Sequence, residues 1–177
     1  MSAGSEALSF SFFVIVSTCL VTIPTYLFIA GIKLYKANKR NDEETIERYS
    51  PIFEGKRFNN PLAIQYVVVF LLRRFALISL LVFARGQSTI QVIGYLILSF
   101  LMLVYIKKVR PFKDPQYNRV ELFNEKCVFI SGCLIFLQTD AFGNSLEFRY
   151  RIGWFQIGTT LLVVVVGVVL MTRANIH

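Results

Sequence analysis

Two adjacent arginines inside an apolar stretch are the residues of this chain whose chemistry most needs an explanation. Arg73 and Arg74 lie 11 residues into the run Leu62 to Ala84, which is a depth of about 16 Å at 1.5 Å per helical residue. An arginine near the centre of a bilayer costs about 2.5–3.5 kcal/mol on an insertion scale. Because helix side chains tilt toward the helix N-terminus, both guanidinium groups can reach back toward the headgroups. The pair predicts a site where arginine meets a carboxylate or a phosphate.

Two carboxylates on a later helix are candidate partners for these arginines. Glu121 and Glu125 are four residues apart, which places them on one face of a helix, and Asn118 precedes them. Bidentate contacts between arginine and carboxylate best offset the desolvation of the two groups. We predict that Arg73 or Arg74 pairs with one of the two glutamates.

The second arginine of the pair has more than one possible role. Adjacent residues diverge by about 100° around a helix, so the other guanidinium is expected to hold an anionic lipid headgroup or to contact a partner subunit. Snorkelling with a tertiary salt bridge is the purely structural alternative, and a transport pathway or voltage sensor is a third. A voltage sensor needs basic residues at every third position, and this stretch offers one adjacent pair.

Residues for catalysis and metal binding are scarce. His177 is the only histidine, so a haem with two histidine ligands, a zinc site of the HExxH type and a Ser-His-Asp triad have no internal base. No glycine-rich phosphate loop is found, and the three cysteines lie in apolar blocks without metal-ligand spacing. We expect no enzyme, no metal, no nucleic-acid partner, and no cofactor beyond a bound anionic phospholipid.

The composition is that of a membrane protein. The 177 residues are 55% hydrophobic and 17% charged, whereas soluble domains are about 25% charged. The apolar residues fall in long blocks, which excludes a disordered chain, a small disulfide scaffold and a soluble globule. The first 32 residues contain no Lys or Arg, so we expect neither a cleavable signal nor an arginine-rich mitochondrial presequence.

Five apolar blocks are long enough, or nearly so, to cross a bilayer, which takes about 20 residues. The fourth is the weakest, because its uninterrupted apolar core runs only from Cys127 to Leu137. Pro24 lies near the middle of the first block and predicts a kink there. We predict one all-α, polytopic transmembrane domain over residues 1–177, with helices at about 8–32, 62–84, 89–106, 121–142 and 152–171 and inner loops at 33–61 and 107–120.

Local signals mark where the helices begin and turn. Asn60-Pro61 and Asp114-Pro115 each combine an N-cap residue with a first-turn proline, so they predict the starts of the second and fourth helices. Ser50-Pro51 predicts a short capped turn inside the first loop. The tight turn Arg85 to Ser88 predicts that the second and third helices form an antiparallel hairpin.

Lys and Arg fall mainly on one side of the predicted bundle. The loop after the first helix carries 7, the loop after the third carries 6, and the C-terminal tail carries 1. The opposite side carries 3, namely Arg85, Arg149 and Arg151. This bias of 14 to 3 predicts an N-out, C-in orientation, where "in" is the cytosol or an organelle's matrix. If the fourth block does not span, the fifth reverses and this count of Lys and Arg on each side is wrong.

Two features of the fifth helix and its flank leave alternatives open. Asp140 and Glu147 lie near the outer arginines, where ordinary solvated pairing is favoured over coordination of an ion. Gly158, with Thr159 and Thr160, either seats a close contact with another helix or faces lipid.

Several stretches together resemble a known family. The chain contains YSPIFEG from Tyr49, FLLRRF from Phe70, RPFK from Arg110 and NRVELFNE from Asn118, followed by Thr139-Asp140 and RYRIGW from Arg149. In this order they resemble the C-terminal membrane domain of large TRP-like multi-pass proteins of unicellular eukaryotes, over residues 45–170. The resemblance implies a polytopic helical bundle in which the double arginine and the Asn/Glu helix recur together. It also implies a channel role, although the chain has no recognisable selectivity filter.

Two functions from different classes fit these features. The first is a non-enzymatic membrane subunit that packs into and stabilises a larger complex through lipid and partner contacts. A basic chain without a presequence suits a respiratory-chain or ATP-synthase assembly of the mitochondrial inner membrane. The second is a TRP-like cation channel or transporter component, which requires a symmetric homo-oligomer around a water-lined path.

Overall fold

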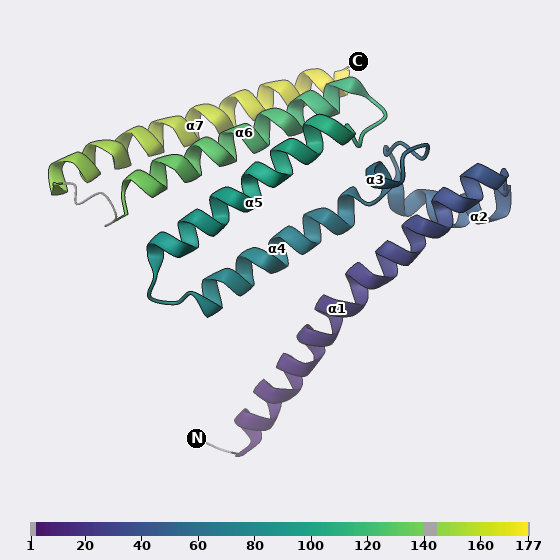
Figure 1. The fold of residues 1–177 in the computed structure, drawn as a ribbon, viewed down its shortest axis with the longest axis horizontal. Helices are drawn as coiled ribbons and strands as arrows, with labels where there is room; N and C mark the ends of the chain where they lie inside the picture. Colours follow the sequence, from purple (N-terminus) through teal and green to yellow (C-terminus); the bar gives the residue numbers. More distant parts are fainter. Residues whose placement is uncertain (1–2, 140–144, 177) are drawn as a thin grey trace. The chain divides into compact units, whose positions relative to one another are not determined.

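Helices make up every regular element that the structure describes. This computed structural model describes the backbone of residues 3–139 and 145–176, and the side chains of residues 18, 21–139, 145–169 and 172. Within these ranges the chain forms helices joined by short connections (Figure 1). The predicted all-α fold class is confirmed.

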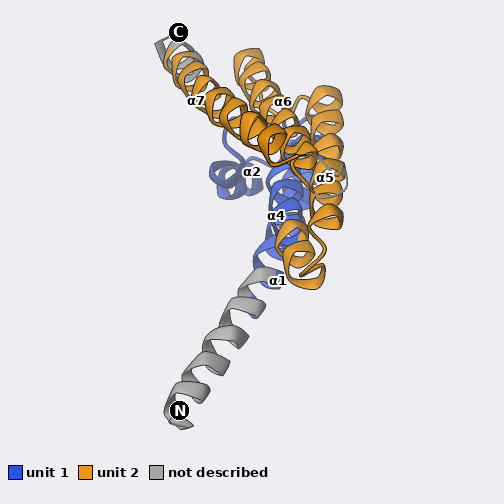
Figure 2. Cartoon of the chain, turned by 90° about the vertical axis from the view of Figure 1, so that its left-hand side faces the viewer, with its two compact units in different colours: residues 1–75 blue, residues 76–177 orange. Residues whose placement is uncertain are grey.

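The helices divide between two compact units, residues 1–75 and residues 76–177 (Figure 2). Helix α4 begins in the first unit and ends in the second. In chain order the elements are α1 (Ala3–Arg40), α2 (Glu43–Tyr49), the 3₁₀ helix η1 (Ser50–Phe53), α3 (Pro61–Ile64), α4 (Tyr66–Phe83), α5 (Ser88–Val109), α6 (Pro115–Leu137) and α7 (Leu146–Ile176).

Three helices are long and apolar enough to cross a membrane. They are the segments Tyr66–Phe83, Ser88–Val109 and Leu146–Val169, and they fit an integral membrane protein. The predicted span 121–142 falls on α6, which is not one of the three, because charged residues occupy its first half. The predicted span 8–32 falls on α1, where the side chains of residues 8–17, 19 and 20 lie outside the described set. The count of five and the N-out, C-in orientation stay predictions.

The loops are shorter than the sequence predicted. Helix α1 continues through Lys39 and Arg40, basic residues that interact favourably with the negative end of the helix dipole. The inner loop predicted over 33–61 is therefore wrong in its first part, and it also contains α2 and η1. The loop predicted over 107–120 shrinks to residues 110–114, because α6 already begins at Pro115.

The N-caps behave largely as predicted. The Asn60 side chain accepts a hydrogen bond from the Leu62 N–H at 3.0 Å, and Asp114 accepts one from the Gln116 N–H at 2.7 Å. The turn at Ser50-Pro51 is present as η1, but the predicted cap is wrong. Tyr49 occupies the N-cap position, and no side chain bonds there.

Helix α1 is continuous across Pro24. Nearby threonine hydroxyls bond within the helix: Thr22 Oγ1 donates to the Thr18 carbonyl at 2.9 Å, and Thr25 Oγ1 donates to the Val21 carbonyl at 2.7 Å. Such bonds satisfy carbonyls around a proline. The kink at Pro24 stays a prediction.

The first unit has a small core where α1 meets η1 and α3. Leu34, Phe53 and Ile64 are fully buried and pack together with Ala30. The short η1 helix inserts Phe53 into this core, and the left-handed Gly55 (φ +74°) then turns the chain away.

One glutamine interrupts the helix that the sequence predicted over 62–84. Gln65 separates α3 from α4, and its Nε2 donates to the Phe28 carbonyl of α1 at 3.0 Å. Gly31 faces this side chain so closely that an added Cβ would lie 2.8 Å from Gln65 Nε2. The glycine therefore allows α1 and the α3–α4 junction to approach each other.

The second unit is a layer in which α6 packs against α5 on one side and α7 on the other (Figure 1). Tyr95 of α5 donates a hydrogen bond to the Val128 carbonyl of α6 at 3.2 Å. Gly132 makes room for the same ring, since a Cβ there would lie 2.5 Å from Tyr95 Cε1. The end of α4 joins α5 as a hairpin, as predicted, and Gln91 Nε2 donates to the Leu81 carbonyl at 3.2 Å.

Candidate functional site

The two arginines lie in the middle of the apolar helix α4 but differ in exposure. Arg73 is half-buried, whereas Arg74 is exposed. Because adjacent helix positions diverge by about 100°, the two side chains leave α4 in different directions. The two members of the pair thus lie in different environments.

The Arg74 side chain turns back along its own helix. Its guanidinium carbon lies 5.0 Å from the centroid of the Phe70 ring, one turn nearer the start of α4. This distance is that of a cation–π contact. The charged group therefore lies nearer to the helix N-terminus than its own Cα does, which is the direction that snorkelling requires.

Two aromatic rings connect Arg74 to a buried lysine. The Tyr66 and Phe70 rings stack with centroids 6.5 Å apart and an interplanar angle of 27°. Lys56 Nζ lies 4.1 Å from the centroid of the Tyr66 ring, and Lys56 is only 7% exposed. We call Lys56, Tyr66, Phe70 and Arg74 the cation–aromatic ladder.

The fold of the first unit builds the ladder from two segments. The Lys56 N–H donates to the Phe53 carbonyl at 3.1 Å, so the buried core residue of η1 anchors the lysine backbone. The junction at Gln65 places Tyr66 at the first position of α4. Phe70 and Arg74 then follow at intervals of four residues, which is the spacing of neighbours on one helix face.

Sequence reasoning missed three of the four ladder residues. The signal that was present is the four-residue spacing of Tyr66, Phe70 and Arg74. Lys56 carried no such signal, because it comes from a loop whose path depends on the packing of Phe53. The ladder offers two cations in a largely apolar setting, and aromatic faces stabilise each by about 0.5–2 kcal/mol.

The predicted carboxylate partners lie in the second unit, on α6. Glu125 is 6% exposed and Glu121 is half-buried. A carboxylate so deeply buried requires polar or charged neighbours. Their pairing with Arg73 or Arg74 would join the two units, and it stays a prediction.

Asn118, the third residue predicted at that site, binds the loop that precedes α6. Its Oδ1 accepts from the Phe112 N–H at 3.1 Å, and its Nδ2 donates to the carbonyls of Phe112 at 2.8 Å and Asp114 at 3.1 Å. Asn118 is 8% exposed. These bonds fix the turn between α5 and α6.

The RPFK stretch forms the corner that Asn118 holds. Arg110 ends α5 in the left-handed conformation (φ +49°), and its N–H donates to the Ile106 carbonyl at 3.0 Å. Pro111 is fully buried and cannot continue the helix. The Phe112 and Tyr117 rings lie 6.3 Å apart across the corner.

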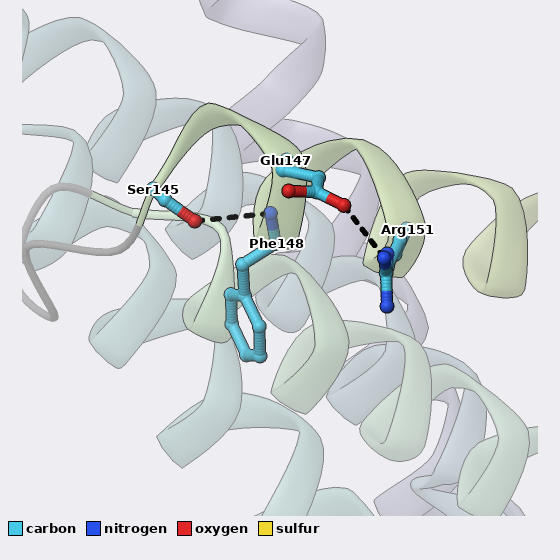
Figure 3. A network of polar contacts seen from close by, with 4 residues as sticks. All are labelled: Ser145, Glu147, Phe148 and Arg151. Carbon is cyan, nitrogen blue, oxygen red and sulfur yellow. Dashed lines mark hydrogen bonds and ion pairs between the residues drawn. The ribbon is translucent and has the colours of Figure 1, made fainter.

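An acidic and a basic residue in the first two turns of α7 form a solvated pair. Arg151 donates to Glu147 Oε1 at 2.6 Å, while the Glu147 and Arg151 side chains stay 73% and 76% exposed (Figure 3). Ser145 Oγ caps the start of α7 by accepting from the Phe148 N–H at 3.4 Å. Ordinary pairing is confirmed for these two residues, and Asp140 lies outside the described residues.

Metal-ligating side chains do not cluster in the described part of the chain: no group of three or more His, Cys, Asp or Glu could hold an ion there. Cys127 and Cys133 are free thiols, and the side chain of Cys19 lies outside the described set. The expected absence of a metal and a cofactor stays a prediction.

Comparison of this chain with protein families, with curated proteins and with solved structures finds no match. The resemblance to TRP-like membrane domains therefore stays a prediction. The candidate site rests on its geometry: a cation–aromatic ladder on an apolar helix, ending at an exposed arginine.

Proposed function

We propose that this chain is a non-enzymatic integral membrane subunit that packs into, and stabilises, a larger membrane protein complex. The observation that carries the proposal is the bare apolar surface of α7. None of the residues in its apolar window is buried within the chain. A surface of this kind contacts lipid or other transmembrane helices.

Helix α7 has two distinct faces. Half-buried residues recur at helical spacing, including Ile152, Gln156 and Val163, on a helix that packs against α6. Exposed apolar residues cover much of the remaining surface, including Leu161 and Val165. One face thus serves this chain's own packing, and the other is available to a neighbour.

Gly158 gives the exposed surface a place where another helix can approach closely. A Cβ added at Gly158 would meet nothing within 4 Å. The hydroxyls beside it are already bonded within α7, since Thr159 donates to the Phe155 carbonyl and Thr160 to the Gln156 carbonyl, both at 2.8 Å. Small residues such as Gly158 let two helix backbones approach closely in membranes.

The compartment that we propose is the mitochondrial inner membrane, with a respiratory-chain or ATP-synthase assembly as the complex. Its support is the charge distribution, with 7 Lys and Arg over residues 33–57 and 6 over residues 107–126. Segments this basic are retained on the matrix side.

The test is extraction in mild detergent, followed by identification of the proteins that migrate with the chain. We expect one copy beside several different proteins, and we expect Gly158→Leu to abolish this co-migration. Val164→Leu is the matched control, because it also adds bulk to the exposed surface of α7 but points elsewhere.

Two outcomes would contradict the proposed subunit role. Migration as a single chain surrounded by detergent would remove the need for a complex. A symmetric homo-oligomer with conductance in bilayers would instead favour the TRP-like channel.

A further inference from the structure

We propose that Arg74 binds the phosphate of an anionic phospholipid in the leaflet where α4 begins. This inference deepens the lipid contact of the proposed function and names its residue and its ligand class. It assigns the lipid contact to Arg74 and not to Arg73, whereas the sequence alone leaves open which of the two arginines makes it.

The depth of the Arg74 guanidinium fits a headgroup phosphate. Arg74 follows Tyr66, the first residue of α4, by eight positions, or about 12 Å along the helix. The cation–π contact with Phe70 brings the guanidinium back by one turn, to about 6 Å from the start of the helix. For a helix that enters the bilayer at its first residue, the headgroup phosphates of that leaflet lie near this depth.

The guanidinium keeps its hydrogen-bonding capacity for a ligand. Arginine has five N–H donors in a plane, and the Phe70 ring, whose centroid lies 5.0 Å from the guanidinium carbon, has no oxygen or nitrogen atom to accept from them. Among the described residues of the first unit, none accepts a hydrogen bond from Arg74. Phosphate oxygens take two such donors at once, and they are the acceptors that arginine binds best.

The surrounding charge favours an anionic lipid over a zwitterionic one. Lys33, Lys36 and Arg40 are exposed on α1, and they follow Phe28, the residue of α1 that Gln65 contacts next to the start of α4. Basic residues at a membrane surface attract anionic lipid at about 1 kcal/mol each. The first unit therefore carries several exposed cations on the side where α4 begins.

The experiment is native mass spectrometry of the purified full chain with added phosphatidylglycerol or phosphatidylcholine. We expect Arg74→Gln to weaken phosphatidylglycerol binding about tenfold, as loss of a charge-assisted hydrogen bond predicts. Arg74→Lys should have an intermediate effect, because a lysine keeps the charge but not the planar donors. Arg85→Gln is the matched control, since Arg85 is an exposed arginine in the turn after α4.

Several results would overturn the proposal. These are unchanged phosphatidylglycerol affinity in Arg74→Gln, an equal loss in Arg85→Gln, and equal binding of both lipids by the original chain. Unchanged lipid affinity together with loss of a partner protein would assign Arg74 to a partner carboxylate. Circular dichroism shows whether each variant is folded, and Arg74→Lys tests the site should Arg74→Gln not fold.

This test and the test of the subunit role can fail independently. Lipid binding is measured on the isolated chain, whereas co-migration is measured on detergent extracts. A chain that binds phosphatidylglycerol but migrates without other proteins contradicts the subunit role and leaves the lipid site of Arg74 supported.

Discussion

The ladder in the first unit and the Asn118 corner in the second handle buried polar groups in different ways. Lys56 and Asn118 are 7% and 8% exposed. The Asn118 amide makes three hydrogen bonds to the backbone of one loop. The ladder instead places cations against aromatic faces, and its far end is the exposed Arg74. The Asn118 amide, bonded by its own fold, holds that fold together, whereas the exposed Arg74 at the end of the ladder keeps donors for a ligand.

The largest effect should come from breaking the corner. Asn118→Leu removes three buried hydrogen bonds and should lower the free energy of unfolding by about 2–4 kcal/mol. Asn118→Asp is the control, because it keeps the acceptor for the Phe112 N–H and should cost less. Unfolding by denaturing detergent, followed by circular dichroism, measures both. An Asn118→Leu variant as stable as the original would show that the corner is not held by the amide.

The next largest effect should come from adding a methyl group at a closely packed glycine in each unit. Gly132→Ala should destabilise by about 1–3 kcal/mol, because its Cβ would meet the Tyr95 ring at 2.5 Å. Gly31→Ala should cost less, because the nearest atom is the end of the Gln65 side chain, at 2.8 Å.

Gly158→Ala is the control for both glycine variants. Nothing lies within 4 Å of its Cβ, so it should be neutral, or stabilising by up to about 1 kcal/mol through helix propensity. Equal losses at all three glycines would contradict the packing described for α5 with α6 and for α1 with the α3–α4 junction.

A double-mutant cycle measures the interaction energy between Phe70 and Arg74 in the cation–aromatic ladder. Phe70→Leu and Arg74→Gln, singly and together, should show a coupling energy of about 0.5–1 kcal/mol from the cation–π contact. The same unfolding assay reports it. Additive effects would mean that ring and guanidinium do not interact, and the ladder would end at Phe70.

The exposed N-cap of α2, formed by Asp42, should respond to pH. Thr45 donates to Asp42 through its Oγ1 at 2.7 Å and its N–H at 3.3 Å, and these hydrogen bonds lower the pKa of Asp42 below its ordinary value of 3.8. A lowered folded-state pKa stabilises α2 fully above the ordinary value, and that contribution is lost as pH falls through the folded value. The protection of α2 amides from hydrogen exchange, measured relative to the intrinsic exchange rate at each pH, should therefore fall at low pH. The variant Asp42→Asn, which keeps a capping oxygen but does not titrate, should remove this dependence.

The smallest effect should come from the exposed ion pair at the start of α7. Glu147→Gln should change the free energy of unfolding by less than about 0.5 kcal/mol, because solvent screens the pair with Arg151. A larger loss in the unfolding assay would mean that the Ser145 to Arg151 turn is shielded from water.

Sequence rules predicted the parts of the fold that depend on near neighbours. Asn60 and Asp114 cap helices because a capping side chain and a following proline act within one turn. The partners of Asn118 come from a loop, and its position beside two glutamates suggested a different role. Lys56 reaches Tyr66 only after Phe53 is packed, so no local pattern could pair them.

The corner between α5 and α6 has a consequence for biogenesis. Helix α6 is not apolar enough to count among the three candidate spans, yet Gly132 and the Tyr95–Val128 hydrogen bond fit it to α5. A segment that enters a bilayer poorly alone can enter beside one that enters well. We therefore expect α5 to leave the insertion machinery first and α6 to follow against it, with the Asn118 corner formed before either helix is released to lipid.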